Sequence, residues 1–374
     1  MIEIWFWQNI VSPHVGSLVE ELASNGYRLT YVAEKPMSND RIKQGWLPPE
    51  IKNVRLIYVQ SQYEVASLVK KAPVDVIHIS AGLRSTGIVK YAQKELSILN
   101  RKQWVIMESI SNTGFIGFLR KVFYRNLIFF KFKNLQGILA IGSETKDWLK
   151  DVGFPFKKIY SFSYFLPAPQ EIEFQKLILP KSERFRFIFV GQFIERKNLK
   201  LLIDSLSFLD KIDFEFIVIG SGKLENSLHS YAKSKLSSKL LWIGKLHQSD
   251  VKSAIRQADC LVLPSFFDGW GAVVAESLIV GTPAICSDTC GSSNIVVASR
   301  IGGVFNNNNQ DQLTKLLAHQ LGQGRIAPVK RKEIVEWAKS LQAKAGAIYL
   351  EKIIKHSENK SELMLKEFLE VNKM

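Results

Sequence analysis

The sequence has 374 residues, of which 46% are hydrophobic and 23% are charged. This balance is typical of folded globular domains and argues against a disordered chain. The length is sufficient for two domains of ordinary size, each with its own core. Fifty Lys and Arg residues against 35 Asp and Glu give a net charge of +15, so we expect an anionic partner: a nucleotide, a phospholipid surface or a nucleic acid.

The cysteines and the apolar segments indicate the compartment. Cys260, Cys286 and Cys290 are odd in number and lack metal-ligand spacing, so we interpret them as core thiols in a reducing cytosol. The first residues, MIEIWFWQN, include an acid and no basic segment, which favours a first strand over a signal peptide. No uncharged apolar run reaches about 18 residues, so we expect no membrane-spanning helix.

In the first half of the chain, apolar runs alternate with helical patterns. We expect strands at 2–7, 28–33, 54–59, 74–79, 104–107 and 137–141, and helices at about 15–22, 63–71 and 85–99. Such alternation predicts a mostly parallel sheet with helices on both faces.

Residues 167–183 are rich in proline and lack a strict period, so we interpret them as an interdomain linker. The alternation then restarts, with strands at 185–191, 214–220 and 240–244 and helices at 197–209, from 224, and at 250–257. Two consecutive α/β units predict two Rossmann-like domains facing a central cleft. A charged, helix-like segment from about 333 to 371 ends the chain.

Residues 261–288, LVLPSFFDGWGAVVAESLIVGTPAICSD, predict a strand, a glycine-containing loop, a helix and a second strand. The amides of Gly271, Ala272 and Val273 open this helix, where unpaired N–H groups and the helix dipole favour an anion such as phosphate. Asp268 precedes the turn, and Glu276 lies about one turn into the helix. Carboxylates accept hydrogen bonds from sugar hydroxyls, which suits a nucleotide diphosphate sugar: hexose at Asp268, diphosphate at the helix start, ribose at Glu276. The alternative is a turn aspartate and a solvated helix glutamate.

This segment resembles the E-x7-E signature of the GT-B retaining glycosyltransferases, family 4 type (glycosyl transferases group 1), with Asp268 where many members carry Glu. The resemblance implies donor binding by Asp268, Gly269, Trp270, Gly271, Ala272, Val273 and Glu276. It also implies an N-terminal acceptor-binding domain at 1–170, a nucleotide-sugar-binding domain at 183–345, and a C-terminal helix and tail at 346–374 that returns to the first domain.

A second segment follows the strand at 185–190. Gly191 frees the backbone there, and Arg196 and Lys197 place two cations at a helix start, which opposes the helix dipole unless an anion lies between them. The segment is similar to the family's G-R-x-x-x-K-G motif, with Gln192 at the Arg position and Asn198 at the final Gly. The resemblance implies that Lys197, with Arg196 as the substitute guanidinium, clamps the donor diphosphate.

Gly222 belongs to a G-x-G sequence that resembles the family's loop beside the nucleotide. No D-x-D sequence follows a strand and no paired Cys or His-x-x-x-His occurs, so we expect no cofactor and no required metal. We assign the catalytic roles to Asp268, His14 and Lys197.

The first domain offers candidate acceptor-binding residues: His14 and Arg84 at the mouths of strands, His78 in VDVIHIS, and Glu108, which stands where many relatives place a His. For His14 the alternative is a surface histidine, and for His78 a satisfied core histidine.

Residues 115–137 contain five cations, seven aromatic residues and no acid. A basic, aromatic helix of this kind can lie on an anionic membrane surface, although a core helix with solvated charges is the alternative. If the helix binds a membrane, we expect a protein at the inner face of the cell membrane that acts on a lipid-linked acceptor.

The function that the sequence favours is transfer of a hexosyl group from a UDP- or GDP-sugar to a sugar or lipid-linked sugar acceptor in cell-surface polysaccharide assembly. Two alternatives stay open. One is a basic protein that binds nucleic acid or a membrane surface without catalysis. The other is a sugar-nucleotide epimerase of the same fold. No nucleic-acid-binding module is recognisable, so we expect no nucleic-acid partner.

Overall fold

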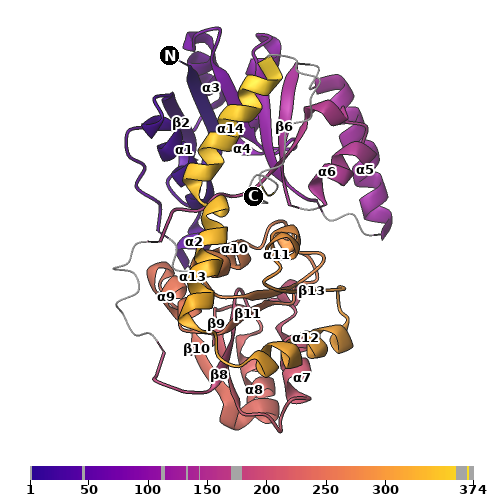
Figure 1. The fold of residues 1–374 in the computed structure, drawn as a ribbon. Helices are drawn as coiled ribbons and strands as arrows, with labels where there is room; N and C mark the ends of the chain where they lie inside the picture. The colour runs from indigo at the N-terminus through magenta and orange to yellow at the C-terminus, as the bar shows by residue number, and fades with distance from the viewer. Residues whose placement is uncertain are drawn as a thin grey trace. The chain divides into compact units, whose positions relative to one another are not determined.

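The computed structural model describes residues 2–43, 47–110, 114–131, 134–142, 144–169, 179–358 and 369. The chain divides into two compact units; Figure 1 draws the first in indigo to magenta with the chain from Gln342 in yellow, and the second mainly in pink to orange. The first unit comprises residues up to Ile42, Leu47–Pro167 and the chain from Gln342, and the second is chiefly Ala168–Leu341.

The first unit is built on a seven-stranded parallel sheet with the strand order β3-β2-β1-β4-β5-β6-β7. Its elements are β1 (Glu3–Ile10), α1 (Pro13–Ser24), β2 (Arg28–Lys35), α2 (Asn39–Lys43), β3 (Arg55–Tyr58), α3 (Gln62–Lys71), β4 (Ile77–Ala81), α4 (Gly87–Ile98), β5 (Gln103–Glu108), α5 (Gly114–Lys131), β6 (Leu135–Ile141), α6 (Thr145–Asp151), η1 (Phe156–Lys158), β7 (Ile159–Phe162) and α14 (Ala343–Glu358).

The second unit is built on a six-stranded parallel sheet with the order β10-β9-β8-β11-β12-β13. Its elements are β8 (Phe185–Val190), η3 (Glu195–Lys197), α7 (Leu199–Ser207), β9 (Phe214–Ile219), α8 (Glu225–Leu236), η4 (Ser237–Lys239), β10 (Leu240–Gly244), α9 (Gln248–Arg256), β11 (Cys260–Leu263), α10 (Ala272–Ile279), β12 (Ala284–Ser287), α11 (Ser293–Ser299), β13 (Gly302–Phe305), α12 (Gln310–Gln323), α13 (Pro328–Trp337) and η5 (Ala338–Leu341).

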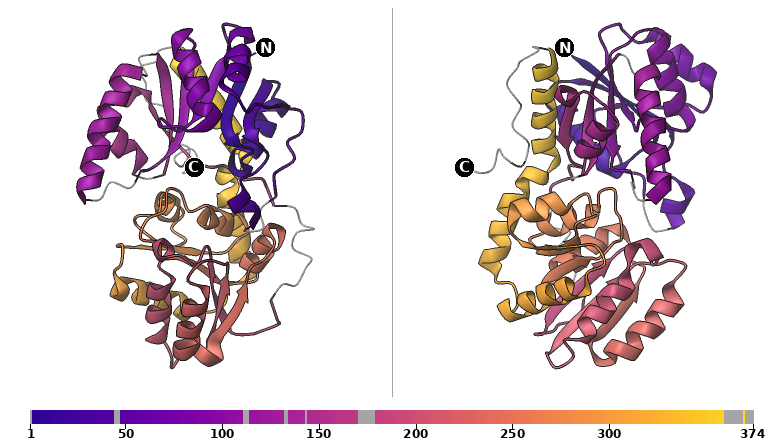
Figure 2. Two further views of the ribbon diagram at one scale, coloured as in Figure 1. Left: turned by 180° about the vertical axis from the view of Figure 1, so that it is seen from behind. Right: turned by 90° about the vertical axis from the view of Figure 1, so that its right-hand side faces the viewer.

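Helices pack on both faces of each sheet, as Figure 2 shows. In the second unit, α7, α8 and α12 cover one face, where the strand residues Phe187, Phe189 and Phe216 are fully buried among helix leucines. In the first unit, α3 and α4 pack on the β1 side of the sheet, while α5 and α6 pack on β5 and β6. Strands buried on both faces explain why the sequence reads as continuous apolar runs rather than as an alternation.

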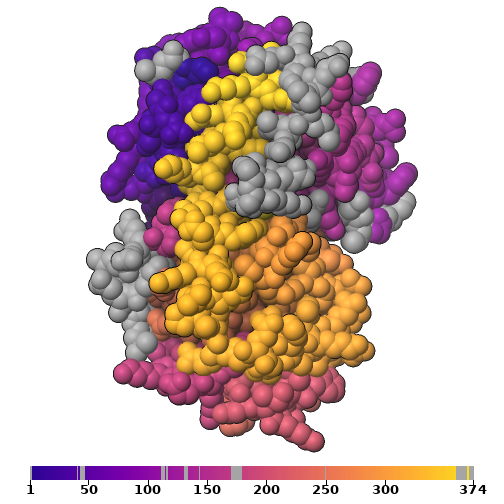
Figure 3. Space-filling view, viewed as in Figure 1, coloured from indigo at the N-terminus to yellow at the C-terminus, as the bar shows by residue number. Residues whose placement is uncertain are grey.

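The C-terminal helix α14 belongs to the first unit and packs against α1, and Figure 3 shows its yellow surface beside the indigo of the N-terminal segment. Ala347, Leu350 and Ile354 are buried, and Asn25 donates a hydrogen bond to Glu351 at 2.7 Å. The expectation that the C-terminal helix returns to the first domain is therefore confirmed.

Several elements differ from the sequence prediction. The helix expected over 333–371 is two helices, α13 and α14, separated by η5, and the part of that prediction beyond residue 358 lies outside the described residues apart from residue 369. The strands β7 and β13 and the helices α11 and α12 were not predicted. Most of the proposed linker, residues 170–178, also lies outside the described residues.

Candidate functional site

In the second unit the strand order reverses between β8 and β11, since β9 and β10 lie on one side of this pair and β12 and β13 on the other. Open parallel sheets bind ligands beyond the carboxyl ends of the strands at such a switch point. The loop after β8 begins at Gly191, and the loop after β11 runs from Pro264 to Gly271. Both sequence-predicted donor segments therefore lie at the switch point.

The loop after β8 leads into the single turn η3 and ends at Asn198, which has φ 49° and ψ 39°. Left-handed backbone favours Gly, and Asn tolerates it best among the other residues. This conformation explains why Asn198 can stand where the resembling motif carries Gly. The preceding residue, Lys197, is thereby held at the start of α7.

Hydrogen bonds to backbone carbonyls join the two loops. The amide of Phe266 donates to the carbonyl of Arg196 at 2.9 Å, and the Arg196 guanidinium donates to the carbonyl of Phe267 at 2.9 Å. The loop after β12 supports them from a third side, because the Asp268 amide donates to the Thr289 carbonyl at 3.2 Å.

These bonds place two cations around one carboxylate. Lys197 Nζ forms a hydrogen-bonded ion pair with Asp268 Oδ2, and Arg196 Nη1 lies 3.4 Å from Asp268 Oδ1. The Lys197 and Asp268 side chains are each only 12% exposed, whereas that of Arg196 is 43% exposed. Two positive charges against one negative charge leave the cluster with a net charge of +1, which favours an anionic ligand.

Helix α10 begins beside this cluster. Gly271, its N-cap residue, has φ 80°, and an added Cβ would lie 2.9 Å from a Leu263 methyl group and 3.1 Å from the Ser292 hydroxyl. The turn therefore requires glycine for its backbone conformation and for its close packing. The amides of Ala272 and Val273 belong to the first turn of the helix, whose N–H groups lack intrahelical partners.

Glu276 lies in the second turn of α10 and is half-buried. Burial raises the pKa of its carboxyl above the ordinary value, and the positive charge of Lys252 on α9 partly opposes this rise. Because the rise in pKa reflects an unfavourable environment for the charged form, the Glu276 carboxylate is held at a cost to stability, which is common for functional groups.

Two predicted donor residues have structural roles that the sequence did not show. Trp270 is 2% exposed, so its side chain belongs to the core. Gly222 lies against Phe193, since an added Cβ would be 2.5 Å from the Phe193 carbonyl oxygen, and the Leu224 amide donates to that oxygen at 3.0 Å. The backbone packing explains this glycine without a ligand.

In the first unit, the structure brings two of the predicted acceptor residues to one tyrosine. The ring of His14 stacks on Tyr164, with centroids 5.2 Å apart, and Tyr164 is hydrogen-bonded to the Glu108 carboxylate. Burial, then the nearby charge of Glu108 and this hydrogen bond, raise the pKa of Tyr164 well above its ordinary value. Burial and the positive charge of Arg41 lower the pKa of His14 to about 4. His14 is therefore neutral at physiological pH.

His78 does not occupy the position that acceptor binding requires. It lies near the amino end of β4, is 1% exposed, and accepts a hydrogen bond at Nδ1 from the indole N–H of Trp7 at 3.2 Å. Burial and the charge of Arg101 lower its pKa to about 3. The prediction that His78 contacts the acceptor is thus corrected: His78 is a neutral core histidine.

Arg84 follows β4 at the carboxyl edge of the first sheet and is exposed. Its guanidinium lies over the ring of Phe123 on α5, 5.2 Å from the centroid. The structure therefore shows a contact of Arg84 with α5.

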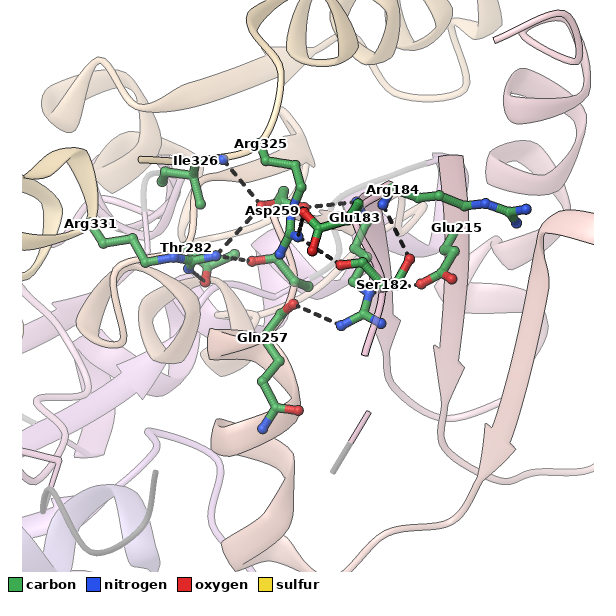
Figure 4. A network of polar contacts seen from close by, with 12 residues as sticks. Ser182, Glu183, Arg184, Glu215, Gln257, Asp259, Thr282, Arg325, Ile326 and Arg331 are labelled. Atoms are coloured by element: carbon green, nitrogen blue, oxygen red, sulfur yellow. Dashed lines mark hydrogen bonds and ion pairs between the residues drawn. The ribbon is translucent and has the colours of Figure 1, made fainter. Parts of the chain in front are cut away.

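A buried charged network occupies the opposite edge of the second sheet (Figure 4). Asp259, just before β11, accepts hydrogen bonds from the amides of Arg186 at 2.9 Å and Ile326 at 3.2 Å. The guanidinium groups of Arg325 and Arg331 lie 3.5 Å and 3.6 Å from its oxygens. Burial lowers the pKa of Arg331 to about 10, although Asp259 opposes this effect. The network anchors α13 to the sheet and was not predicted from the sequence.

Two buried polar atoms near the switch point were also missed. The side-chain amide nitrogen of Asn198 and the hydroxyl of Ser265 are buried and have no hydrogen-bond partner among the described residues. Both residues directly adjoin segments singled out in the sequence, but their burial depends on tertiary packing that the sequence pattern does not reveal.

Neither a metal centre nor a spanning helix is found in the described part of the chain. Within the ranges given above, no three His, Cys, Asp or Glu side chains are grouped so that they could hold a metal ion. No helix within those ranges has the length and apolar character needed to cross a membrane.

Comparison with solved structures identifies the fold. The crystal structure of HepE from Anabaena in complex with UDP superposes with a TM-score of 0.70, at 13% identity, over 95% of this chain and all of that one (100%). The fold is GT-B, with two Rossmann-like units, as the sequence resemblance predicted. This likeness concerns the fold alone.

Residues 170–340 match the family described as Glycosyl transferases group 1. This chain therefore carries a domain of that family within a GT-B fold. An uncharacterized glycosyltransferase of Methanocaldococcus jannaschii is 31% identical over 139 residues, which are 37% of this chain and 39% of that protein. The UDP-Gal:alpha-D-GlcNAc-diphosphoundecaprenol alpha-1,3-galactosyltransferase of Escherichia coli is 23% identical over 75% of each chain.

Proposed function

We propose that this chain is a retaining glycosyltransferase that moves a hexosyl group from a UDP- or GDP-sugar to a sugar or lipid-linked sugar acceptor in cell-surface polysaccharide assembly. The observation that carries this proposal is the meeting of Arg196, Lys197 and Asp268 at the switch point of the second sheet. Two cations and a helix N-terminus suit a diphosphate, and the carboxylate suits sugar hydroxyls.

Each side chain then has a role. Lys197 and Arg196 hold the diphosphate and stabilise the charge that develops on it as the glycosidic bond breaks. Asp268 orients the hexose, and Glu276 accepts hydrogen bonds from the ribose hydroxyls. The acceptor oxygen attacks the face that the diphosphate leaves, and its proton passes to the departing phosphate oxygen. This front-face route retains the anomeric configuration without a protein nucleophile.

The acceptor-binding role falls to the first unit. His14 is neutral and Glu108 is hydrogen-bonded to Tyr164, so this cluster offers a carboxylate and an imidazole to sugar hydroxyls at the carboxyl edge of the first sheet. The name of the E. coli relative contains UDP-Gal and a diphosphoundecaprenol-linked sugar, which supports a UDP donor and a lipid-linked acceptor here. We place the protein at the cytoplasmic face of the membrane.

Transfer is proposed to be metal-independent, with Lys197, Arg196 and backbone amides in the role of a metal ion. The test is release of nucleoside diphosphate from UDP- and GDP-hexoses, in the presence of a diphosphate-lipid-linked sugar acceptor and with EDTA. We expect acceptor-dependent release, unchanged by EDTA, and a product whose anomeric proton coupling matches that of the donor. Lys197→Met should abolish release, whereas Lys200→Met, which removes an exposed ion pair on α7, should not. Inversion of the anomeric configuration, or dependence on a metal, would refute the corresponding part of the proposal.

A further inference from the structure

Helix α5 presents an apolar face outward. Its inner side packs on the first sheet through Tyr124, whose ring meets Trp148 edge-on at 4.9 Å, and through the partly buried Leu127 and Ile128. On the other side of the helix lie five large apolar residues, the outer face of α5: Phe118 (62% exposed), Leu119 (51%), Val122 (46%), Phe123 (47%) and Phe129 (68%). Within the range 115–137, the side chains of Phe115, Phe130, Lys131, Phe132 and Lys133 lie outside the described residues.

This arrangement reverses the usual pattern of a surface helix. At 100° per residue, Phe118, Val122 and Phe129 form one stripe that points away from Tyr124, where an ordinary amphipathic helix carries polar residues. A core helix with solvated charges would bury these aromatic rings. The exposed rings therefore favour the surface-binding interpretation over the core-helix one. Contiguous apolar patches on a folded surface mark binding sites.

Cations border the outer face. Arg125 is exposed at one edge of the stripe, whereas Arg120 lies on the Tyr124 side of the helix and acts on that tyrosine. Arg84 contacts Phe123 from the β4–α4 loop. Lys121 is paired with Asp151 of α6 at 2.7 Å. Residues 114–131 contain no acid. Apolar side chains bordered by arginines match an anionic bilayer, which offers hydrocarbon beneath a layer of phosphates.

We propose that the outer face of α5 docks on an anionic phospholipid bilayer, with its aromatic and aliphatic side chains at the boundary between headgroups and acyl chains. Arg125 and Arg84 then lie at the level of the lipid phosphates, since long cationic side chains extend toward the polar region. The inference deepens the proposed function, and rests on it only in that a lipid-linked acceptor would lie in the same membrane.

The test is co-sedimentation of the full chain with vesicles of phosphatidylcholine alone or with added phosphatidylglycerol. We expect binding to the anionic vesicles, and at least a tenfold weaker affinity for Phe118→Ser/Val122→Ser/Phe129→Ser. The control is Tyr63→Ser/Val74→Ser, which removes two apolar residues that are more exposed (88% and 77%) elsewhere on the first unit and should bind as the wild type does. Arg84→Gln/Arg125→Gln should reduce the preference for phosphatidylglycerol.

Other outcomes would overturn the inference. One is absence of vesicle binding by the wild type, and another is unchanged vesicle binding by the triple variant. A third is a wild-type dimer in light scattering and a monomeric triple variant, because the outer face of α5 would then be a contact between two copies of the chain. Nucleotide-induced stabilisation of the same variants separates the two proposals. A triple variant that still responds to nucleotide is folded, and loss of membrane binding in it leaves the donor site intact.

Discussion

Lys197 and Asp268 are 71 residues apart in the sequence, yet they form a nearly buried ion pair that joins the loop after β8 to the loop after β11. The pair neutralises the carboxylate at the proposed diphosphate site, so a diphosphate could approach without meeting an uncompensated negative charge. It also fixes the lysine that the proposed function assigns to the diphosphate.

Breaking this pair should cost stability as well as function. Removing one partner of a buried pair leaves the other charge uncompensated, so we expect Lys197→Met or Asp268→Asn to lower the free energy of unfolding by about 3 kcal/mol each. The double variant should lose less than the sum, because neither charge is left alone. Urea unfolding of the four proteins measures this coupling, and strictly additive losses would contradict it.

Substitution of Glu276 should weaken nucleotide binding but raise the stability of the folded protein. Because burial raises the pKa of its carboxyl, the charged form is disfavoured in the folded state, and Glu276→Gln should raise the melting temperature at pH 7. Loss of charge-assisted hydrogen bonds worth about 1.5–3 kcal/mol should weaken nucleotide binding roughly 10- to 100-fold. Melting curves and titration calorimetry on the same samples test both effects. A variant that binds nucleotide as tightly as the wild type would exclude Glu276 from the site.

The lowered pKa values of two histidines predict that the protein loses stability in mild acid. The pKa values of His14 and His78 are lowered to about 4 and about 3, below the ordinary 6.5. As the pH falls through 6.5, the unfolded chain takes up protons that the folded chain refuses, so stability present above pH 6.5 is lost until about pH 4 and pH 3, respectively.

The slope is at most about 1.4 kcal/mol per pH unit for each histidine. His78→Gln keeps a hydrogen-bond acceptor for the Trp7 indole, and it should unfold in urea with a smaller change between pH 7 and pH 5 than the wild type. Equal slopes for the two proteins would mean that His78 is protonated in the folded state.

Disrupting the network around Asp259 should lower the stability of the protein without changing its affinity for nucleotide. Asp259→Asn removes the negative charge that faces two arginines, and we expect a loss of about 3 kcal/mol, or several degrees in melting temperature. Asp259 precedes β11 and the donor segments follow the strands, so nucleotide affinity should stay within about twofold. A large loss of affinity would show that the two edges of the sheet are coupled.

The sequence predicted the elements whose signal is local. The apolar runs at 185–190 and 240–244 coincide with β8 and β10, because the strands of a parallel sheet covered by helices on both faces carry few polar residues. The short strand β13 contains two glycines, Gly302 and Gly303, and so lacked this signal. The C-terminal helix was predicted as one piece because η5 breaks it without a proline or a glycine.

The sequence predicted those parts of the candidate site that residue spacing and backbone chemistry determine. The glycine turn at Gly271, the cations of the η3 turn and Asp268 are all recognisable in the sequence. Their direct contact was not, since the pairing of Lys197 with Asp268 depends on the order of strands in the sheet. His78 was misassigned for the same reason, because its burial beside Trp7 depends on which strand lies next to β4.

The central claim is that Lys197, Asp268 and Glu276 form the binding site for a nucleotide diphosphate sugar. Its most direct test is ligand-induced thermal stabilisation with a panel of nucleotides and nucleotide sugars, including UDP and GDP forms. The proteins to compare are the wild type, Glu276→Gln and Lys197→Met, with Asp259→Asn as the destabilised control. Ligand at a hundredfold over Kd should add about 2.7 kcal/mol. We expect a shift confined to one base, retained in Asp259→Asn and lost in Lys197→Met and Glu276→Gln. No shift with any nucleotide, or an equal shift in Lys197→Met, would contradict it.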